Sequence, residues 1–149
     1  MSMPSGVPSG TAGNLLLDDI HVLLGDGECD EGQVWEAAMS AAHYGLDNLV
    51  AIVDRNGIQN DRWTHEVMQI EPLMDKWEAF GWHCIETGGH DISELLSSLA
   101  CATEVQGQPT AIVARTVKGK GVSFMENNPD FHGKAPNSEE FRTALAEIG

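Results

Sequence analysis

Short apolar runs alternate with helix-like segments along most of the chain. Apolar runs bounded by glycine or turn residues are typical of buried parallel strands, and they predict strands at residues 20–24, 49–53, 82–87 and 110–117. Apolar positions at helical spacing predict helices at residues 33–44, 72–80, 91–103 and 138–148. Because strands and helices alternate, we expect an α/β fold, a parallel sheet with helices on both faces.

Details of this pattern add four expectations. The first run, residues 20–24, reads as a buried strand, and the broad apolar face of helix 33–44 predicts burial on more than one side. Asp91 and Glu94 predict a capping box, and Ser138 is the expected N-cap of the last helix. The alanines of helix 33–44 would also admit a helix from a partner chain. We expect one domain over residues 19–149, after a flexible lead-in at residues 1–18.

Composition narrows the classes of partner. The 149 residues carry 23 acidic and 8 basic side chains, a net charge of −15. Nucleic-acid grooves and anionic membrane surfaces require clustered Lys and Arg, so we expect neither partner. Three cysteines without Cys-x-x-Cys spacing predict reduced thiols in a cytoplasmic protein. No run approaches the roughly 20 apolar residues of a membrane span, and the first residues lack the pattern of a signal peptide.

Polar side chains follow the first two predicted strands. Asp26 lies in Gly25-Asp26-Gly27, and Asn56 lies in the sequence Asp-Arg-Asn-Gly-Ile at residues 54–58. The carboxyl ends of parallel strands emerge at one edge of a sheet, so Asp26 and Asn56 can meet. Their oxygens suit Mg²⁺, which fills its other positions with phosphate oxygens and water. This pattern indicates a phosphorylated cofactor held through its metal, although Asn56 alone also fits an Asn-Gly turn.

Four ordered segments carry a family resemblance. They are residues 25–36, 54–58, 118–125 and 131–137. From about residue 21 to its end, the chain resembles the diphosphate-binding module of thiamine-diphosphate enzymes, specifically the N-terminal half of transketolases. The resemblance implies the fold of that module, shortened at its N-terminus, with thiamine diphosphate and Mg²⁺ as cofactors.

The resemblance also implies roles for individual residues. Asp26, the Asn56 side chain and the Ile58 carbonyl would bind Mg²⁺. Gly27 and Glu28 would lie against the cofactor, with Gly27 leaving room for the diphosphate.

Two further positions match catalytic or coupling residues of the family. His132 would lie near the diphosphate and the substrate and act in catalysis. Glu31 would lie at the interface between subunits and tune the cofactors, with a smaller part for Glu36. Simpler interpretations stay open, because both glutamates suit a helix N-terminus and His132 suits a surface loop. Lys118 and Lys120 fit either the cofactor phosphates or an exposed glycine-rich loop.

These inferences define the expected function. The chain would be the diphosphate- and Mg²⁺-binding subunit of a two-chain transketolase-like enzyme that moves a two-carbon ketol unit from a ketose phosphate to an acceptor. A second subunit would carry the pyrimidine-binding domain, in a heterotetramer. One alternative is glycolyl-type transfer to an acyl carrier protein in a biosynthetic pathway, and another is a non-catalytic interaction module.

The short segment before the first strand leaves the origin of the chain open. About 20 residues precede that strand, and none of them is a histidine, whereas transketolases carry substrate and cofactor histidines there. A truncated fragment, the product of a split gene, and a relative with a different acceptor chemistry all fit this observation.

Overall fold

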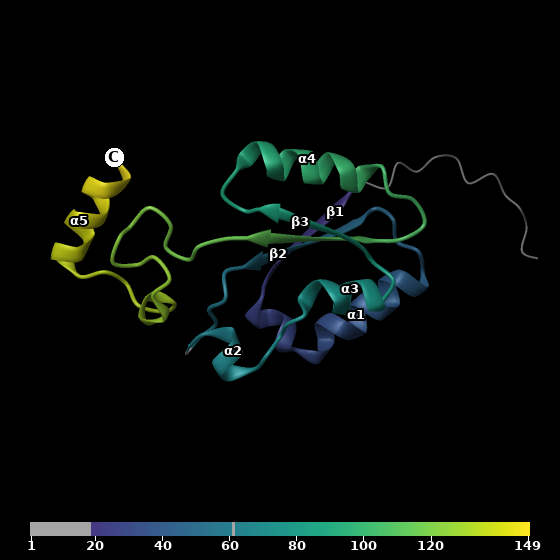
Figure 1. The fold of residues 1–149 in the computed structure, drawn as a ribbon, viewed down its shortest axis with the longest axis horizontal. Coiled ribbons are helices and arrows are strands. Elements are labelled where there is room, and N and C mark those ends of the chain that lie inside the picture. Colours follow the sequence, from purple (N-terminus) through teal and green to yellow (C-terminus); the bar gives the residue numbers. More distant parts are fainter. Residues whose placement is uncertain (1–18, 61) are drawn as a thin grey trace, which may run out of the picture.

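A four-stranded parallel sheet forms the centre of the molecule (Figure 1). The computed structural model describes residues 19–60 and 62–149, so the predicted lead-in at residues 1–18 lies outside the described residues. The strands, in the spatial order β1-β2-β4-β3, are β1 (Ile20–Gly25), β2 (Leu49–Arg55), β4 (Thr110–Arg115) and β3 (His83–Gly88). All three strand pairs are parallel, which confirms the predicted α/β class.

Helices and 3₁₀ turns connect these strands. The predicted helices are α1 (Gly32–His43), α3 (Leu73–Ala79), α4 (Ile92–Thr103) and α5 (Ser138–Ile148). The sequence pattern did not predict three short elements, η1 (Gly27–Asp30), α2 (Thr64–Val67) and η2 (Pro129–Phe131). Each has three or four residues, which is too short for an apolar period to be visible.

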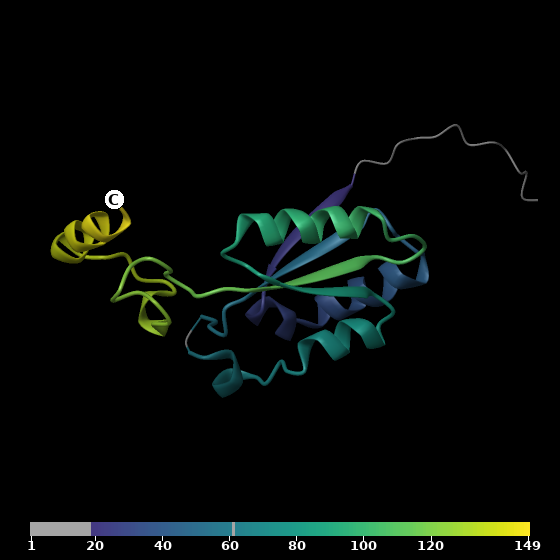
Figure 2. The same ribbon diagram turned by 45° about the horizontal axis from the view of Figure 1, so that its top comes forward.

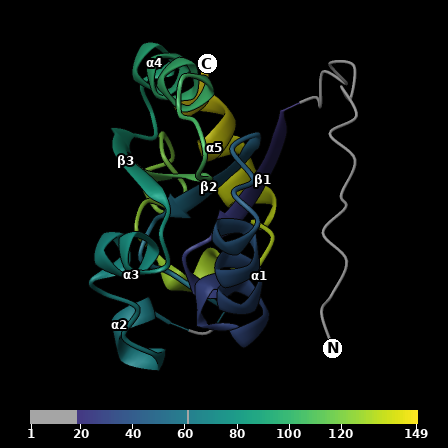
Figure 3. The same cartoon turned by 90° about the vertical axis from the view of Figure 1, so that its right-hand side faces the viewer.

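The central strands bury side chains on both faces of the sheet. Ala51 and Val53 of β2 belong to a core under α1 and α3, whereas Val50 and Ile52 pack with Ala102 of α4. This alternation follows the two-residue period of a strand and explains the continuous apolar runs. Figures 2 and 3 show α4 on one side of the sheet and α1 with α3 on the other.

The first strand and the first helix are less buried than predicted. Among the described residues, β1 pairs with β2 and with no second strand, and Leu23 is 71% exposed. The prediction of a buried first strand was therefore wrong, because β1 lies at an edge of the sheet. In α1, Ala38 and Ala41 are buried but Met39 is 57% exposed, so one side of this helix is covered rather than several.

Two helix starts differ in detail from the predictions. The Asp91 carboxylate accepts from the Ser93 and Glu94 N–H groups, but the Glu94 side chain accepts from the Gly88 N–H at 2.9 Å instead of closing a capping box. At α5 the N-cap is Asn137, not Ser138. The Asn137 amide oxygen lies one residue earlier and accepts from two helix N–H groups, while Glu140 accepts from the Asn137 N–H.

The C-terminal segment lies beyond the carboxyl edge of the sheet. After β4 the chain passes through a loop and η2 to α5, which stands apart from the sheet in Figures 1 and 2. Glu147 holds α5 to this loop, because its two oxygens accept from the Ser123 N–H at 2.6 Å and the Ser123 hydroxyl at 2.7 Å. Phe141 and Leu145 remain about half exposed on α5.

Two sequence-level exclusions meet the structure here. Within residues 19–60 and 62–149, no helix has the length and apolar character needed to cross a membrane. All three cysteines, Cys29, Cys84 and Cys101, are free thiols.

Two buried indoles allow a matched test of how the helical layer is held to the sheet. Trp82 Nε1 donates to the Ala38 carbonyl of α1 at 2.9 Å, whereas Trp77 Nε1 is buried without a partner among the described residues. Both substitutions to phenylalanine remove similar apolar volume, but only Trp82→Phe removes a hydrogen bond. Trp82→Phe should therefore lower the free energy of unfolding by about 1 kcal/mol more than Trp77→Phe. Urea denaturation measures the difference, and equal losses would contradict it.

Candidate functional site

The carboxyl ends of β1 and β2 lie side by side. Gly25 pairs with Asp54 in the parallel register, and the Asp26 N–H donates to the Asp54 carbonyl at 3.1 Å. The two motifs that the sequence singled out therefore meet at one edge of the sheet. This juxtaposition follows from the parallel pairing of strands that are joined by a helical crossover.

Asp26 joins the two strand ends through its side chain. The carboxylate is 1% exposed, and it accepts from the Gly27 N–H at 2.9 Å and from the Gly57 N–H at 2.6 Å. Gly57 has a φ of +78°, a conformation that favours glycine and that turns its N–H toward Asp26. Burial raises the pKa of the Asp26 carboxyl, the two N–H donors lower it, and the nearby Asp54 charge raises it further. A cation at this position would stabilise the ionised form.

The Asn56 amide is held at both ends. Its oxygen, Oδ1, accepts from the Ile58 N–H at 3.0 Å, and its nitrogen, Nδ2, donates to Asp54 Oδ2 at 3.2 Å. Asp54 Oδ1 in turn accepts from the Thr116 hydroxyl, which follows β4. A hydrogen-bonded chain thus runs from the end of β4 to Asn56.

These groups line a polar cavity of about 360 Å³. Its walls come from the ends of β1 and β2 and from the segment after β4, which are distant in sequence. The predicted residues that line it are Asp26, Gly27, Glu28, Glu31, Asn56, Ile58, Lys118 and His132. Sequence reasoning missed Gly25, Asp54, Gln59 and Asn60 as lining residues. All four lie inside or directly beside the two motifs, and this adjacency is the signal that could have found them.

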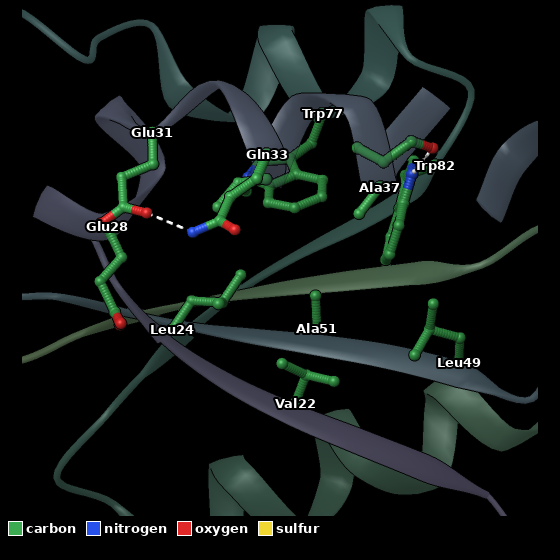
Figure 4. A pocket seen from close by; sticks show the side chains of 12 residues that line it. Val22, Leu24, Glu28, Glu31, Gln33, Ala37, Leu49, Ala51, Trp77 and Trp82 are labelled. Atoms are coloured by element: carbon green, nitrogen blue, oxygen red, sulfur yellow. Dashed lines mark hydrogen bonds between the residues drawn. The ribbon is translucent and has the colours of Figure 1, made fainter. Parts of the chain in front are cut away.

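The two glutamates after Gly27 have local partners. Glu28 Oε2 accepts from the Gly25 N–H at 2.6 Å, so this side chain folds back over the turn. Glu31 accepts from the Gln33 side chain, as Figure 4 shows, and makes no side-chain capping bond to α1. Helix capping therefore does not account for Glu31. Glu36 is exposed and does not line the cavity.

The segment after β4 brings a histidine and a lysine to the cavity. His132 ends η2, and its Nδ1 is buried without a hydrogen-bond partner among the described residues. Such an atom is available to a ligand in the cavity, because buried polar groups normally have a partner. Lys118 lines the same cavity, whereas Lys120 lies 3.8 Å from Glu126 instead.

The donor set suits Mg²⁺ and a diphosphate. The described residues contain no cluster of three or more His, Cys, Asp and Glu side chains with metal-binding geometry, so an all-protein cage is not present there. One carboxylate, one amide and one backbone carbonyl are instead the small oxygen set that leaves positions for phosphate and water. Cys29 adds no nucleophile, because burial, aided by the Asp26 charge, raises the pKa of its thiol to about 12.

A second cavity, of about 310 Å³, lies between β1, β2 and the helices α1 and α3. Figure 4 shows Val22, Leu24 and Ala51 on the strand side, with Trp77 and Trp82 opposite them. Its lining is mainly apolar, which does not suit a diphosphate. Glu28 and Glu31 line both cavities, so the two spaces adjoin at the η1 turn.

Comparison with known proteins identifies relatives over most of the chain. The sequence matches the family described as transketolase, thiamine diphosphate binding domain, over residues 10–149. It is 44% identical over 133 residues to the 6-deoxy-6-sulfo-D-fructose transketolase subunit SqwG of Clostridium sp. (strain MSTE9), covering 89% of this chain and 48% of that protein. It is 41% identical over 128 residues to one of the named subunits of the apulose-4-phosphate transketolase of Phocaeicola vulgatus, covering 86% and 46%. The chain thus spans about half the length of these relatives.

A solved structure shares the fold. The transketolase from Campylobacter jejuni superposes with a TM-score of 0.82 at 30% identity, over 89% of this chain and 21% of that one. A match over so much of the chain agrees with the predicted α/β fold of the diphosphate-binding module.

Gly27 has a testable steric role in the cavity wall. A Cβ built on Gly27 would lie 2.5 Å from the Cβ of Gln59, and that neighbour cannot move without shifting the turn after β2. Gly27→Ala should therefore lower the free energy of unfolding by about 1–3 kcal/mol. Gly32→Ala is the control, because a Cβ there meets nothing within 4 Å, and it should be neutral or stabilising by up to about 1 kcal/mol. Thermal unfolding of both variants decides the point, and equal stabilities would contradict it.

Proposed function

Because the chain belongs to the transketolase family of thiamine-diphosphate-binding domains, we propose that it forms the diphosphate- and Mg²⁺-binding part of a transketolase-like enzyme. The observation that carries the proposal is the polar cavity at the ends of β1 and β2, where Asp26, Asn56 and Ile58 lie together. When bound, thiamine diphosphate supplies the electron sink for cleavage of the carbon–carbon bond beside a ketose carbonyl.

The residues of this chain would bind and orient that cofactor. The Asp26 carboxylate, the Asn56 amide oxygen and the Ile58 carbonyl would hold Mg²⁺, which neutralises the acidic edge of the sheet and bridges it to the diphosphate. Gly27 and Glu28 lie along the same wall. Lys118 would contribute a second positive charge near the phosphates. His132 Nδ1, buried and unpartnered among the described residues, would hydrogen-bond to a cofactor or substrate oxygen.

A two-carbon ketol unit would pass from a ketose phosphate to an aldehyde acceptor. The names of two relatives specify 6-deoxy-6-sulfo-D-fructose and apulose 4-phosphate, so a ketose or its phosphate is the substrate class that similarity favours. No feature of the described residues favours the acyl-carrier-protein acceptor, which stays a prediction. A non-catalytic module would not need a carboxylate and an amide held in a polar cavity.

The active assembly would include a second subunit with the pyrimidine-binding domain, in a cytoplasmic heterotetramer. The word subunit in the names of the relatives supports a partner chain. Exposed apolar side chains support it as well, since Ile20 and Leu23 of β1 and Leu145 of α5 are each more than half exposed. Glu31, at the junction of the two cavities and free of a capping role, would lie near this interface and tune the cofactor from there.

Removing the Asp26 carboxylate tests the metal site. Asp26→Ala and the isosteric Asp26→Asn should weaken Mg²⁺-dependent binding of thiamine diphosphate on the order of 100-fold or more, above the effect expected for a neighbour of a ligand. Isothermal titration of the enzyme as isolated, with any co-purifying partner retained, measures binding with and without Mg²⁺. The control is Asp75→Ala, on the exposed side of α3, with unchanged affinity expected. Unchanged affinity in both Asp26 variants would overturn the proposal.

Replacing His132 tests the catalytic assignment separately. His132→Ala should lower kcat for ketol transfer from a ketose phosphate by roughly 10²–10⁴-fold, because a positioned proton donor or acceptor is lost. Binding of thiamine diphosphate and Mg²⁺ should persist, since His132 is not among the proposed metal ligands. His65→Ala, exposed on α2, is the matched control and should keep full turnover. Full turnover in the His132 variant would make this residue a bystander.

A further inference from the structure

Asp54 is the acidic residue of the cavity to which the proposed function assigns no role. It lies on β2, two residues before Asn56. Both of its carboxylate oxygens are engaged, since Oδ2 accepts from Asn56 Nδ2 at 3.2 Å and Oδ1 accepts from the Thr116 hydroxyl. The Asp54 carboxylate thus already holds two side-chain donors of this chain.

The Asn56 amide has two possible orientations that differ by a half-turn. In the observed one, the Asn56 oxygen accepts from the Ile58 N–H at 3.0 Å and the nitrogen faces the Asp54 carboxylate. In the reversed one, the amide oxygen would face the carboxylate and the NH₂ group would face an N–H donor. Both contacts would then be repulsive, so the Asp54 acceptor selects one orientation.

The selected orientation matters because only the amide oxygen can bind Mg²⁺. An oxygen with two lone pairs can accept from the Ile58 N–H and still offer the second pair to a cation. We infer that Asp54 is a positioning residue, which acts through Asn56 by keeping the Asn56 oxygen on the metal side of the cavity. This inference rests on the proposed metal site and assigns it a supporting residue.

Thr116 extends this support to a third strand. Its hydroxyl donates to Asp54 Oδ1, and its N–H donates to the Arg55 carbonyl at 3.2 Å, so the end of β4 is tied to the end of β2 by two contacts. The Asp54 side chain therefore has its own fixed position. A ligand oriented by a neighbour that is itself oriented is the usual arrangement around protein metal sites.

A double-mutant cycle tests whether Asp54 acts through Asn56. Calorimetric titration of thiamine diphosphate at fixed Mg²⁺ concentrations, on the enzyme as isolated with any co-purifying partner, gives the metal-dependent affinity. Asp54→Ala and Asn56→Ala should each weaken it roughly 10- to 100-fold. The double variant should be no weaker than Asn56→Ala alone, because the effect of Asp54 requires the amide. Additive losses would overturn the inference while leaving the metal site intact.

A conservative variant separates orientation from charge. Asp54→Asn can present its amide oxygen to Asn56 Nδ2 and its NH₂ group to the Thr116 oxygen, so it should keep the affinity within about threefold of the parent. Affinity as low as in Asp54→Ala would show that the negative charge acts directly, which overturns the inference. Urea denaturation of every variant identifies losses caused by unfolding. If Asp54→Ala does not fold, Asp54→Asn and the threonine variants below decide the question.

Two threonines on the same stretch of chain provide the matched control. Thr116→Val removes the donor to Asp54 and should weaken metal-dependent binding roughly tenfold. Thr110→Val, at the start of β4, removes a buried hydroxyl that has no partner among the described residues, and it should leave binding unchanged. Equal affinities in the two variants would overturn the role of the Thr116–Asp54 contact. Failure of Asn56→Ala to weaken binding would instead overturn the metal assignment of the proposed function.

Discussion

The site depends on one buried carboxylate. Asp26 accepts from the Gly57 N–H at 2.6 Å and thereby joins the end of β1 to the turn after β2. Without this contact, the two strand ends would share an edge of the sheet but would have no fixed side-chain geometry. A carboxylate that is 1% exposed carries a desolvation cost that hydrogen bonds offset only in part, which favours a cation nearby. The same contact therefore shapes the turn and creates the demand for positive charge that the proposed Mg²⁺ would meet.

The acidic character of the chain agrees with this local arrangement. Asp26 and Asp54 lie at one strand edge, and Glu28 and Glu31 follow Asp26 closely along the chain. Lys118 is a cationic side chain on the same wall, but its one charge does not balance these acidic groups, so a diphosphate would not bind well to them alone. A divalent cation resolves the conflict, because it attracts the carboxylate on one side and the phosphate on the other. Net charge excluded nucleic-acid partners but did not exclude a metal-bridged phosphate.

The two faces of the sheet are used differently. α1 and α3 cover the larger core, which holds the tryptophans, and α4 covers the smaller one. At the β1 edge, Leu23 and its neighbours remain exposed beside an apolar cavity, and α5 presents further apolar side chains beyond the carboxyl end of β4. These surfaces flank the polar cavity, so a protein partner that covers them would also come close to the proposed cofactor.

Local sequence determined the strands and helices, the glycine-bounded turns and the identity of Asp26, Asn56 and His132 as chemically distinctive residues. Apolar periodicity acts over a few residues, so the element bounds lie within about two residues of those predicted. Parallel strands joined by a helical crossover also place Asp26 and Asn56 at one edge, and this much follows without coordinates. The tertiary structure alone decided that β4 lies between β2 and β3, that β1 is an exposed edge, and that Thr116 reaches Asp54. The reason is that these features depend on pairings between distant parts of the chain, such as Asp54 and Thr116, which are 62 positions apart. Such pairings are set by how the whole sheet packs and leave no periodic trace in the sequence.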